Sequence, residues 1–381
     1  MVFNGIYEEE GNPYKGFKLN KLKDFLLECG LKYDESIEHT VIYTDDNGEI
    51  KATGSLSGNV LKCIAVSETM QGEGLSAAVL SHLTKYAIGK GISHLFLFTK
   101  PKNLRMFEDM GFYKIIETGD ILFMENKRNG IDDYARSLME ETQKAIAENG
   151  ERNSEAVRAR DQAKAKDTAT DTVTDIVADT ATDTVIGAIV ANCNPFTYGH
   201  RYLIEEALKG CDLLHLFILS EDRSYFSAAE RYEMVKAGVG DLLKEGRLIL
   251  HKTSDYLISS ATFPTYFIKD TAKAAAANCE LDVRIFAERI ARPLNITRRF
   301  AGTEPTDVVT NEYNETMKRV LPEYGIEFVE IERMISGLEG PCAGEAISAK
   351  RVRKALSEGD FSEIERLVPP STLSALKNRT K

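Results

Sequence analysis

Short apolar runs and amphipathic stretches alternate along most of the chain and predict its secondary structure. In the first third, apolar runs predict strands at 39–44, 50–56, 60–66 and 94–99. Amphipathic stretches predict a helix at 19–29 and a longer helix from residue 75. The DDNGE segment between the first two strands is typical of a hairpin turn. Together these elements predict a mixed α/β domain.

From residue 185 onward the alternation becomes more regular. The apolar runs predict strands at 185–191, 212–220, 247–251, 282–286 and 326–331. The amphipathic stretches predict helices at 199–209, 230–242 and 265–279, and short helices after Ser348. Alternating strands and helices build a parallel sheet that is covered on both faces. Because ligands bind at the carboxyl ends of strands in such sheets, the loop after the first strand is a candidate binding segment.

A polar tract separates these two regions. A charged stretch at 148–166 is followed by a Thr/Asp/Ala tract whose two copies begin at Asp167 and Asp179. Two copies are too few to stack a core, so a solenoid is not expected. We predict a linker at 130–184 that is helical at first and then extended or disordered. The linker divides the chain into an N-terminal domain, residues 1–129, and a C-terminal domain, residues 185–381.

The overall charge of the chain is acidic, with 48 Lys and Arg against 59 Asp and Glu and a net charge of −11. This balance argues against nucleic acid or an anionic membrane as a partner. The sequence has no run of 18 apolar residues and no apolar segment near its N-terminus, so we expect a cytoplasmic protein without signal peptide or membrane span. The cysteines form no CxxC pair and no spaced Cys/His cluster, so neither a zinc site nor a disulfide framework is expected.

A glycine-containing turn precedes the helix that begins near residue 75. Backbone N–H groups and the helix dipole at such a position favour a pyrophosphate, although a GEG turn alone is also an ordinary helix start. The segment QGEGLS resembles the coenzyme A loop of GNAT acetyltransferases, and residues 103–112 resemble the closing motif of that family. The resemblance covers about residues 15–120 and implies a GNAT-like domain with four candidate coenzyme A ligands: Gln71, Gly72, Gly74 and Ser76. Without an evident general base, catalysis by this domain stays open.

A titratable histidine, His200, stands on the first turn of the helix predicted at 199–209. A lone histidine there is more often exposed or a partner in the helix cap. However, Thr197-Tyr198-Gly199-His200 resembles the (H/T)-x-G-H signature of the HIGH superfamily of adenylyl-transferring enzymes. The late segment ISAKRVR, residues 347–353, resembles the second signature, I-S-S-T-x-I-R. The two segments lie 148 residues apart (348 − 200) in the order that the superfamily requires.

This resemblance implies a Rossmann-like nucleotidyltransferase domain that binds ATP. His200 and Thr197 are the candidates for stabilising the α-phosphate during transfer, and Lys350 and Arg353 for binding the β- and γ-phosphates. Lys350 replaces a threonine of many relatives and could supply charge in its place. Further candidate ATP-binding residues are Asn194, Phe196, Gly199, Gly302, Glu304 and Ser348. Mg²⁺ is expected on the phosphates, but no protein metal ligand is predicted because no carboxylate cage is evident.

Two other segments, residues 219–235 and 298–318, together with the GNAT-like domain, make the chain similar to one family, the citrate lyase ligases. The resemblance covers nearly the whole chain except the linker. It implies that ATP and acetate are used to acetylate a thiol on the acyl-carrier subunit of citrate lyase. That thiol belongs to a dephospho-coenzyme A-derived arm, acetyl-adenylate is the intermediate, and AMP and pyrophosphate are released. We hypothesise that residues 71–76 bind the arm and that the linker lets the N-terminal domain carry it.

Two other enzyme classes and a binding module fit parts of the same sequence. A nucleotide-coenzyme adenylyltransferase of the pantetheine-phosphate or mononucleotide type shares both signatures but needs no acetate. A nucleotide-regulated GNAT protein acetyltransferase would use acetyl-coenzyme A and release no pyrophosphate. A pure binding module would make His200 and Arg353 incidental.

Overall fold

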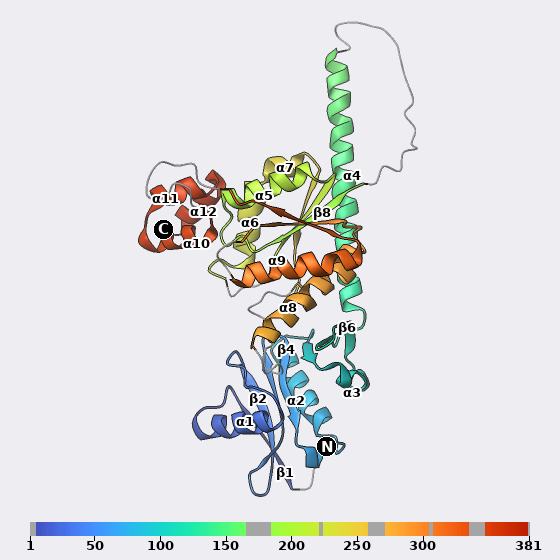
Figure 1. The fold of residues 1–381 in the computed structure, drawn as a ribbon, viewed down its shortest axis with the longest axis vertical. Helices are drawn as coiled ribbons and strands as arrows, with labels where there is room; N and C mark the ends of the chain where they lie inside the picture. The colour runs from blue at the N-terminus through green and yellow to red at the C-terminus, as the bar shows by residue number, and fades with distance from the viewer. Residues whose placement is uncertain are drawn as a thin grey trace. The chain divides into compact units, whose positions relative to one another are not determined.

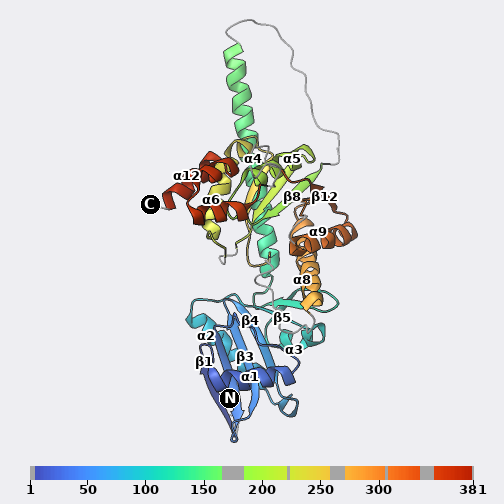
Figure 2. The same cartoon turned by 60° about the vertical axis from the view of Figure 1, so that its left-hand side comes forward.

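The computed structural model describes residues 5–164, 184–220, 224–257, 271–304, 308–334 and 347–379. The chain divides into two compact units, residues 1–132 with 260–285 and residues 133–259 with 286–381. Each unit contains one β-sheet (Figures 1 and 2). The extended part of the predicted linker, residues 165–183, lies outside the described residues. No helix in the described part of the chain is both long and apolar enough to cross a bilayer.

The N-terminal unit is built on a seven-stranded sheet in the order β1-β2-β3-β4-β5-β7-β6. Its strands are β1 Ile6–Gly11, β2 His39–Asp45, β3 Ile50–Ser57, β4 Val60–Val66, β5 Phe96–Thr99, β6 Tyr113–Glu117 and β7 Leu122–Glu125. Its helices include α1 Gly16–Glu28, α2 Leu75–Gly89, α3 Leu104–Asp109 and the short turns η1 Glu68–Met70 and η2 Pro101–Asn103. The four strands predicted for this region are confirmed, whereas β1, β6 and β7 were not predicted.

Helix α2 packs closely on β3 because β3 carries a glycine under the helix. A Cβ on Gly54 would lie 2.3 Å from Cγ1 of Val79 and 3.0 Å from Cδ1 of Leu83. Val79 and Leu83 are one turn apart on α2, and both are fully buried, as expected for the apolar stripe of a helix on a sheet. This contact fixes α2 and, with it, the turn that leads into the helix.

Strands β4 and β5 are parallel but pair only at their first residues. Val60 pairs with Phe96, and Leu61 with Leu97, while β4 continues to Val66 and β5 to Thr99. The other neighbouring strands of this sheet are antiparallel. Beyond Leu61, the edge of β4 that faces β5 therefore has no ladder partner among the described strands, and the sheet opens there.

The C-terminal unit is built on a five-stranded parallel sheet in the order β10-β9-β8-β11-β12. Its strands are β8 Ile186–Ala191, β9 Leu213–Ile218, β10 Leu248–Lys252, β11 Arg298–Gly302 and β12 Glu327–Ile331. The order reverses between β8 and β11, which is the switch point of a Rossmann-like sheet. These two strands pair only at Gly187–Arg298 and Ala188–Arg299, so they also separate toward their carboxyl ends. The predicted α/β fold with a parallel sheet is confirmed.

The remaining helices of the described residues all come after β7 in the chain. They are α4 Gly130–Lys164, α5 Tyr198–Lys209, α6 Ala228–Gly238, α7 Gly240–Lys244, α8 Thr271–Ile285, the π-helical turn η3 Phe286–Ala291, α9 Val308–Val320, the turn η4 Leu321–Tyr324, α10 Ala349–Glu358, α11 Phe361–Leu367 and α12 Pro370–Arg379. The helix predicted at 230–242 is divided at Val239 into α6 and α7. Helix α8 groups with the N-terminal unit.

The strand predicted at 282–286 is wrong, because these residues end α8 and begin η3. Short apolar runs fit a buried helix as well as a strand. The fourth strand is instead β11, which begins with Arg298 and Arg299 and was not predicted. Arg299 is buried, and its guanidinium lies 4.2 Å from the ring centroid of Phe286, a cation–π contact that offsets part of the cost of burying the charge.

Helix α4 occupies the first part of the predicted linker, and its start packs against the C-terminal unit. The ring of Tyr134 stacks on Tyr256 with centroids 5.5 Å apart. One turn farther on, the side chain of Leu138 is buried. Glu141 then contacts Nδ1 of the buried His251 on β10 at 3.0 Å. These contacts give the first turns of α4 a fixed place beside β10.

Candidate active site

A cavity of about 830 Å³ lies where β8 and β11 separate. It is lined by residues after the carboxyl ends of β8, β11 and β12 and by the first turns of α5 and α10. Eight residues predicted for nucleotide binding or catalysis line it: Thr197, Gly199, His200, Gly302, Glu304, Ser348, Lys350 and Arg353. The fold therefore brings most of the predicted site together at the switch point, while the roles of these residues stay predictions.

Helix α5 begins with a reciprocal cap formed by Thr197 and His200. The backbone N–H of His200 donates to Oγ1 of Thr197 at 3.4 Å, and the backbone N–H of Thr197 donates to Nδ1 of His200 at 3.1 Å. The histidine takes the place that Glu or Gln holds in a capping box. The sequence left open whether His200 is a partner in the helix cap or a catalytic group. The geometry of the cap is compatible with both roles.

The cap also determines where the ring of His200 carries its proton. Because Nδ1 accepts the N–H of Thr197, the proton of the neutral ring lies on Nε2. Desolvation of the ring and, secondarily, the positive charge of Arg333 lower the pKa of His200 to about 4. At neutral pH the ring is therefore neutral, and its Nε2–H can donate a hydrogen bond to a ligand in the cavity.

The two signature segments meet at Gly199. A Cβ on this residue would lie 2.9 Å from the carbonyl oxygen of Ile347, so only glycine allows the start of α5 to approach the start of α10 this closely. A second contact joins the segments, because Nη1 of Arg353 donates to the carbonyl oxygen of Asn194. Residues far apart in the sequence thus form one wall of the cavity.

Helix α10 presents a capped N-terminus to the cavity. Oγ of Ser348 accepts the backbone N–H of Arg351 at 3.3 Å. Lys350 is exposed and Arg353 is half-buried, and both line the cavity, whereas the guanidinium of Arg351 pairs with Glu363. The first turns of α5 and α10 both line the cavity, so their helix dipoles and two cationic side chains make it suited to phosphate oxygens.

Arg333, which follows β12, was missed by the sequence analysis although it lines the cavity. Its guanidinium forms an ion pair with Glu304, and its Nε donates to the carbonyl oxygen of Thr303 at 2.7 Å. The pair explains how Glu304 can be buried. No motif marks Arg333 in the sequence, and the only signal is its position just after an apolar strand.

Two predicted ATP-binding residues, Asn194 and Phe196, do not line the cavity. Oδ1 of Asn194 accepts the backbone N–H of Phe226 at 3.1 Å. Phe196 is fully buried against Gly238, where a Cβ would lie 2.4 Å from its Cε1 atom. In this structure both residues hold the loop after β8 in place.

A buried arginine, Arg231 on α6, supports the same loop. Its Nη1 donates to the carbonyl oxygen of Asn192 at 2.8 Å and to Oδ1 of Asn192 at 2.6 Å. Its Nε donates to the carbonyl oxygen of Phe226 at 3.1 Å. The segment 219–235 had been singled out by resemblance alone, and these contacts give part of it a positioning role.

A second cavity, of about 460 Å³, lies in the N-terminal unit where β4 and β5 separate. Gln71, Gly72 and Ser76 line it, together with Lys100 and Lys102. Gly74 is the N-cap of α2 and, like Gly72, has a positive φ, 84° and 87° respectively. The four residues predicted to bind a coenzyme A arm thus lie at or beside one opening of the sheet.

Family models match both parts of the chain. The citrate lyase ligase C-terminal domain matches residues 186–376, and the GNAT acetyltransferase family matches residues 4–112. The second match confirms the predicted GNAT-like fold of the N-terminal domain.

Three curated relatives resemble the chain over most of its length. The citrate (pro-3S)-lyase ligase of Haemophilus influenzae is 36% identical over 366 residues, which cover 94% of this chain and 95% of that protein. The enzyme of the same name from Klebsiella pneumoniae is 37% identical over 92% of this chain and 90% of its own, and that of Escherichia coli K12 is 36% identical over 95% and 91%. The chain therefore belongs to the citrate lyase ligase family.

Proposed function

We propose that the cavity at the switch point binds ATP and joins AMP to acetate, as the first half of a reaction that acetylates citrate lyase. The observation that carries this proposal is the meeting of the two signature segments at Gly199 and Ile347. Their contact surrounds one cavity with helix N-termini and cationic side chains, the environment that a triphosphate requires.

In the first half-reaction, an acetate oxygen attacks the α-phosphorus of ATP and pyrophosphate leaves in line. Such a transfer depends on positioning and on stabilisation of charge at the phosphoryl oxygens. The neutral His200 would donate its Nε2–H to an α-phosphate oxygen, and Lys350 and Arg353 would hold the departing pyrophosphate. A hydrogen-bond donor that is already in position before the reaction stabilises this charge more strongly where water is excluded.

One carboxylate of the cavity, that of Glu332, fits a Mg²⁺ ion that arrives with ATP. Glu304 is paired with Arg333 and is buried, whereas Glu332 lines the cavity and is exposed. Glu332 would therefore hold the ion, directly or through its water ligands, while phosphate oxygens supply most of the coordination. The ion would neutralise charge on the pyrophosphate.

In the second half-reaction, a thiolate attacks the carbonyl carbon of acetyl-adenylate, a thioester forms and AMP leaves. We assign the thiol to the dephospho-coenzyme A-derived arm on the acyl-carrier subunit of citrate lyase. The N-terminal cavity is suited to such an arm, because the free edge of β4 offers backbone groups to its amides. Gln71, Gly72 and Ser76 stand at the start of α2, where its pyrophosphate would bind.

The experiment that tests the proposal is exchange of labelled pyrophosphate into ATP, with Mg²⁺, in the presence and absence of acetate. We expect exchange only with acetate, because acetyl-adenylate must form before pyrophosphate can react back. Exchange that does not depend on acetate but requires a dinucleotide coenzyme would contradict the proposal and favour a nucleotide-coenzyme adenylyltransferase. Acetylation of the carrier by acetyl-coenzyme A without ATP would favour a GNAT acetyltransferase.

A further inference from the structure

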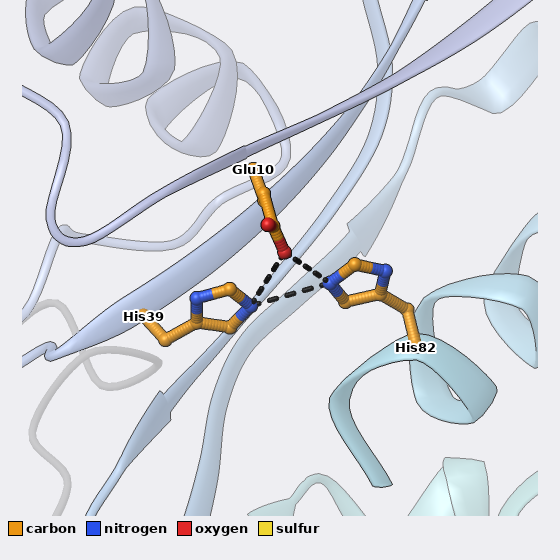
Figure 3. Close-up of side chains that lie close together, drawn as sticks. All are labelled: Glu10, His39 and His82. Carbon is orange, nitrogen blue, oxygen red and sulfur yellow. Dashed lines mark hydrogen bonds and ion pairs between the residues drawn. The ribbon is translucent and has the colours of Figure 1, made fainter. Parts of the chain in front are cut away.

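Two histidines and a glutamate converge on the N-terminal unit, away from the residues that line its cavity. Glu10 comes from β1, His39 from β2 and His82 from α2, and their side chains point toward one another (Figure 3). The two Nε2 atoms lie 3.2 Å apart. Oε2 of Glu10 is 3.3 Å from Nε2 of His82 and 3.8 Å from Nε2 of His39.

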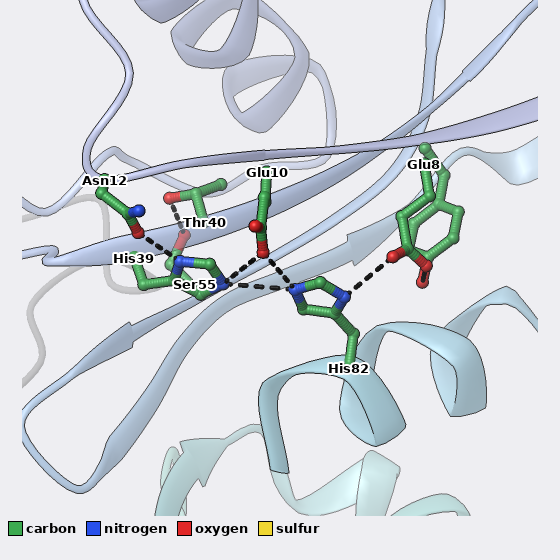
Figure 4. A network of polar contacts seen from close by, with 8 residues as sticks. Glu8, Glu10, Asn12, His39, Thr40, Ser55 and His82 are labelled. Atoms are coloured by element: carbon green, nitrogen blue, oxygen red, sulfur yellow. Dashed lines mark hydrogen bonds and ion pairs between the residues drawn. The ribbon is translucent and has the colours of Figure 1, made fainter. Parts of the chain in front are cut away.

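The neighbours of the two rings determine which nitrogens carry protons. Oδ1 of Asn12 contacts Nδ1 of His39, and Oε1 of Glu8 contacts Nδ1 of His82 at 2.9 Å (Figure 4). Both oxygens are acceptors, so each Nδ1 carries a proton and donates it. In the neutral rings the lone pairs of both Nε2 atoms therefore face each other and the carboxylate of Glu10.

Three lone-pair donors that face one point need a cation between them. We propose that Glu10, His39 and His82 bind a zinc ion. Zinc prefers tetrahedral sites with bonds of about 2.0–2.2 Å to imidazole nitrogen and carboxylate oxygen, so neighbouring ligand atoms lie about 3.3–3.5 Å apart. Two of the separations in this cluster, 3.2 and 3.3 Å, are close to the edges of such a tetrahedron, and the third, 3.8 Å between Glu10 and His39, is slightly longer.

The partners of the two rings are those that zinc-binding histidines have in proteins. Such histidines donate their other ring N–H to a carboxylate or a carbonyl-type oxygen, which fixes the ring and raises its basicity. Glu8 and Asn12 take this place for His82 and His39. The two nitrogen ligands favour zinc over Mg²⁺ and Ca²⁺, which prefer oxygen ligands.

The cluster is rigid on one side and open on the other. His39 is fully buried and stacks on Tyr86 with ring centroids 3.5 Å apart. The side chains of His82 and Glu10 are 17% and 57% exposed, so an ion can reach the site and a water can complete its coordination. Bound zinc would tie β1 and β2 to α2 and so stabilise the fold of the N-terminal unit.

Zinc binding is to be measured on the full chain, purified without a histidine tag and stripped with a chelator. Competition with a chromophoric chelator should show one equivalent bound, and excess Mg²⁺ should not displace it. Co²⁺ in place of Zn²⁺ should give the visible absorption of a tetrahedral N/O site. The unfolding temperature should rise with zinc, since an ion that binds only the folded chain stabilises it.

Variants separate this site from other ligands on the chain. His82→Gln should lower zinc affinity by about 10²-fold or more and abolish the Co²⁺ spectrum, and Glu8→Gln should cost about 10- to 100-fold. The matched control is His94→Gln, because His94 also contacts a carboxylate, Glu125 at 2.7 Å, outside the cluster. It should bind zinc like the parent chain.

Three results would overturn the proposal. The first is a chain that binds no stoichiometric zinc, which would leave a proton shared by His39 and His82 as the cation. The second is zinc binding that survives His82→Gln unchanged. The third is equal loss in His82→Gln and His94→Gln. Each readout is independent of ligase activity, so the proposed function can stand or fail separately.

Discussion

The cavity beside β4 and β5 and the cavity beside β8 and β11 open at equivalent places but have different walls. Each lies where two neighbouring parallel strands separate after two residue pairs, β4 from β5 in one unit and β8 from β11 in the other. The C-terminal cavity is lined by the first turns of two helices and by His200, Arg333 and Arg353. The N-terminal cavity is lined by one free strand edge, a glycine turn and two lysines.

The different walls suit two different tasks, namely stabilising charge in a reaction and binding an extended ligand. Charged side chains and two helix N-termini stabilise charge that develops during phosphoryl transfer. A free strand edge offers evenly spaced backbone groups, which suit an extended ligand with amides. We therefore expect substitutions in the C-terminal cavity to change a chemical rate and those in the N-terminal cavity to change binding of the carrier protein.

The largest effect is expected for His200→Ala. Loss of one preorganised donor to the transition state should lower the rate of acetate-dependent pyrophosphate exchange by about 10²–10³-fold. His94→Ala, in the other unit, should leave the exchange rate unchanged. An unchanged rate in a folded His200→Ala chain would remove the histidine from the proposed mechanism and weaken the comparison of the two cavities.

Gly199→Ala should break the contact between the two signature segments. Its Cβ would lie 2.9 Å from the carbonyl oxygen of Ile347, so the helix starts must move apart. We expect a loss of about 1–3 kcal/mol in the free energy of unfolding, together with slower pyrophosphate exchange. Gly240→Ala is the control, since nothing lies within 4 Å of its Cβ. Equal effects of both variants in urea unfolding would show that close approach at Gly199 is unimportant.

Ser76→Asp tests the N-terminal cavity. The new carboxylate would stand in the first turn of α2, where it suits the helix dipole but repels a pyrophosphate. We expect KM for the acyl-carrier protein to rise about tenfold, or about 1.4 kcal/mol, with pyrophosphate exchange unchanged. The control is Ser76→Asn, because Asn is nearly the same size as Asp but neutral, and it should have little effect on KM. If Ser76→Asp slowed pyrophosphate exchange and left KM for the carrier protein unchanged, the two cavities would not have separate tasks.

A further effect concerns acid stability. The pKa of His200 is lowered to about 4 and that of His215, on β9, to about 3, in both cases chiefly by desolvation. In the unfolded chain the pKa of histidine is about 6.5. Between about pH 6.5 and pH 4 the unfolded chain therefore binds more protons than the folded chain, so the free energy of unfolding falls as the pH drops.

Urea unfolding at several pH values measures this slope. His200→Gln cannot take up the proton in the unfolded state, so its stability should depend less steeply on pH, by at most about 1.4 kcal/mol per pH unit. Identical slopes for the parent and His200→Gln would mean that the histidine is accessible to protons in the folded chain. The ring of His200 would then be less desolvated than its lowered pKa requires.

Local patterns in the sequence predicted most of the elements and both signature segments. Strands such as β2 and β8, and helices such as α5, have a clear apolar period, and the cap at Thr197 depends on residues only three positions away. The prediction failed at 282–286, where an apolar run fits either a helix or a strand. It also failed at β11, because two consecutive arginines suggest an exposed segment. Only the fold shows that the guanidinium of Arg299 packs on the ring of Phe286.

The sequence by itself thus determined the class of fold, the family and most of the candidate nucleotide site, because motifs and periodicity are short-range properties. Only the tertiary structure decided which distant residues meet. Gly199 touches Ile347, Arg333 pairs with Glu304, and Glu10 approaches two histidines because sheets and helices bring these backbones together. Such contacts depend on burial and on close packing across elements, which no local pattern of residues encodes.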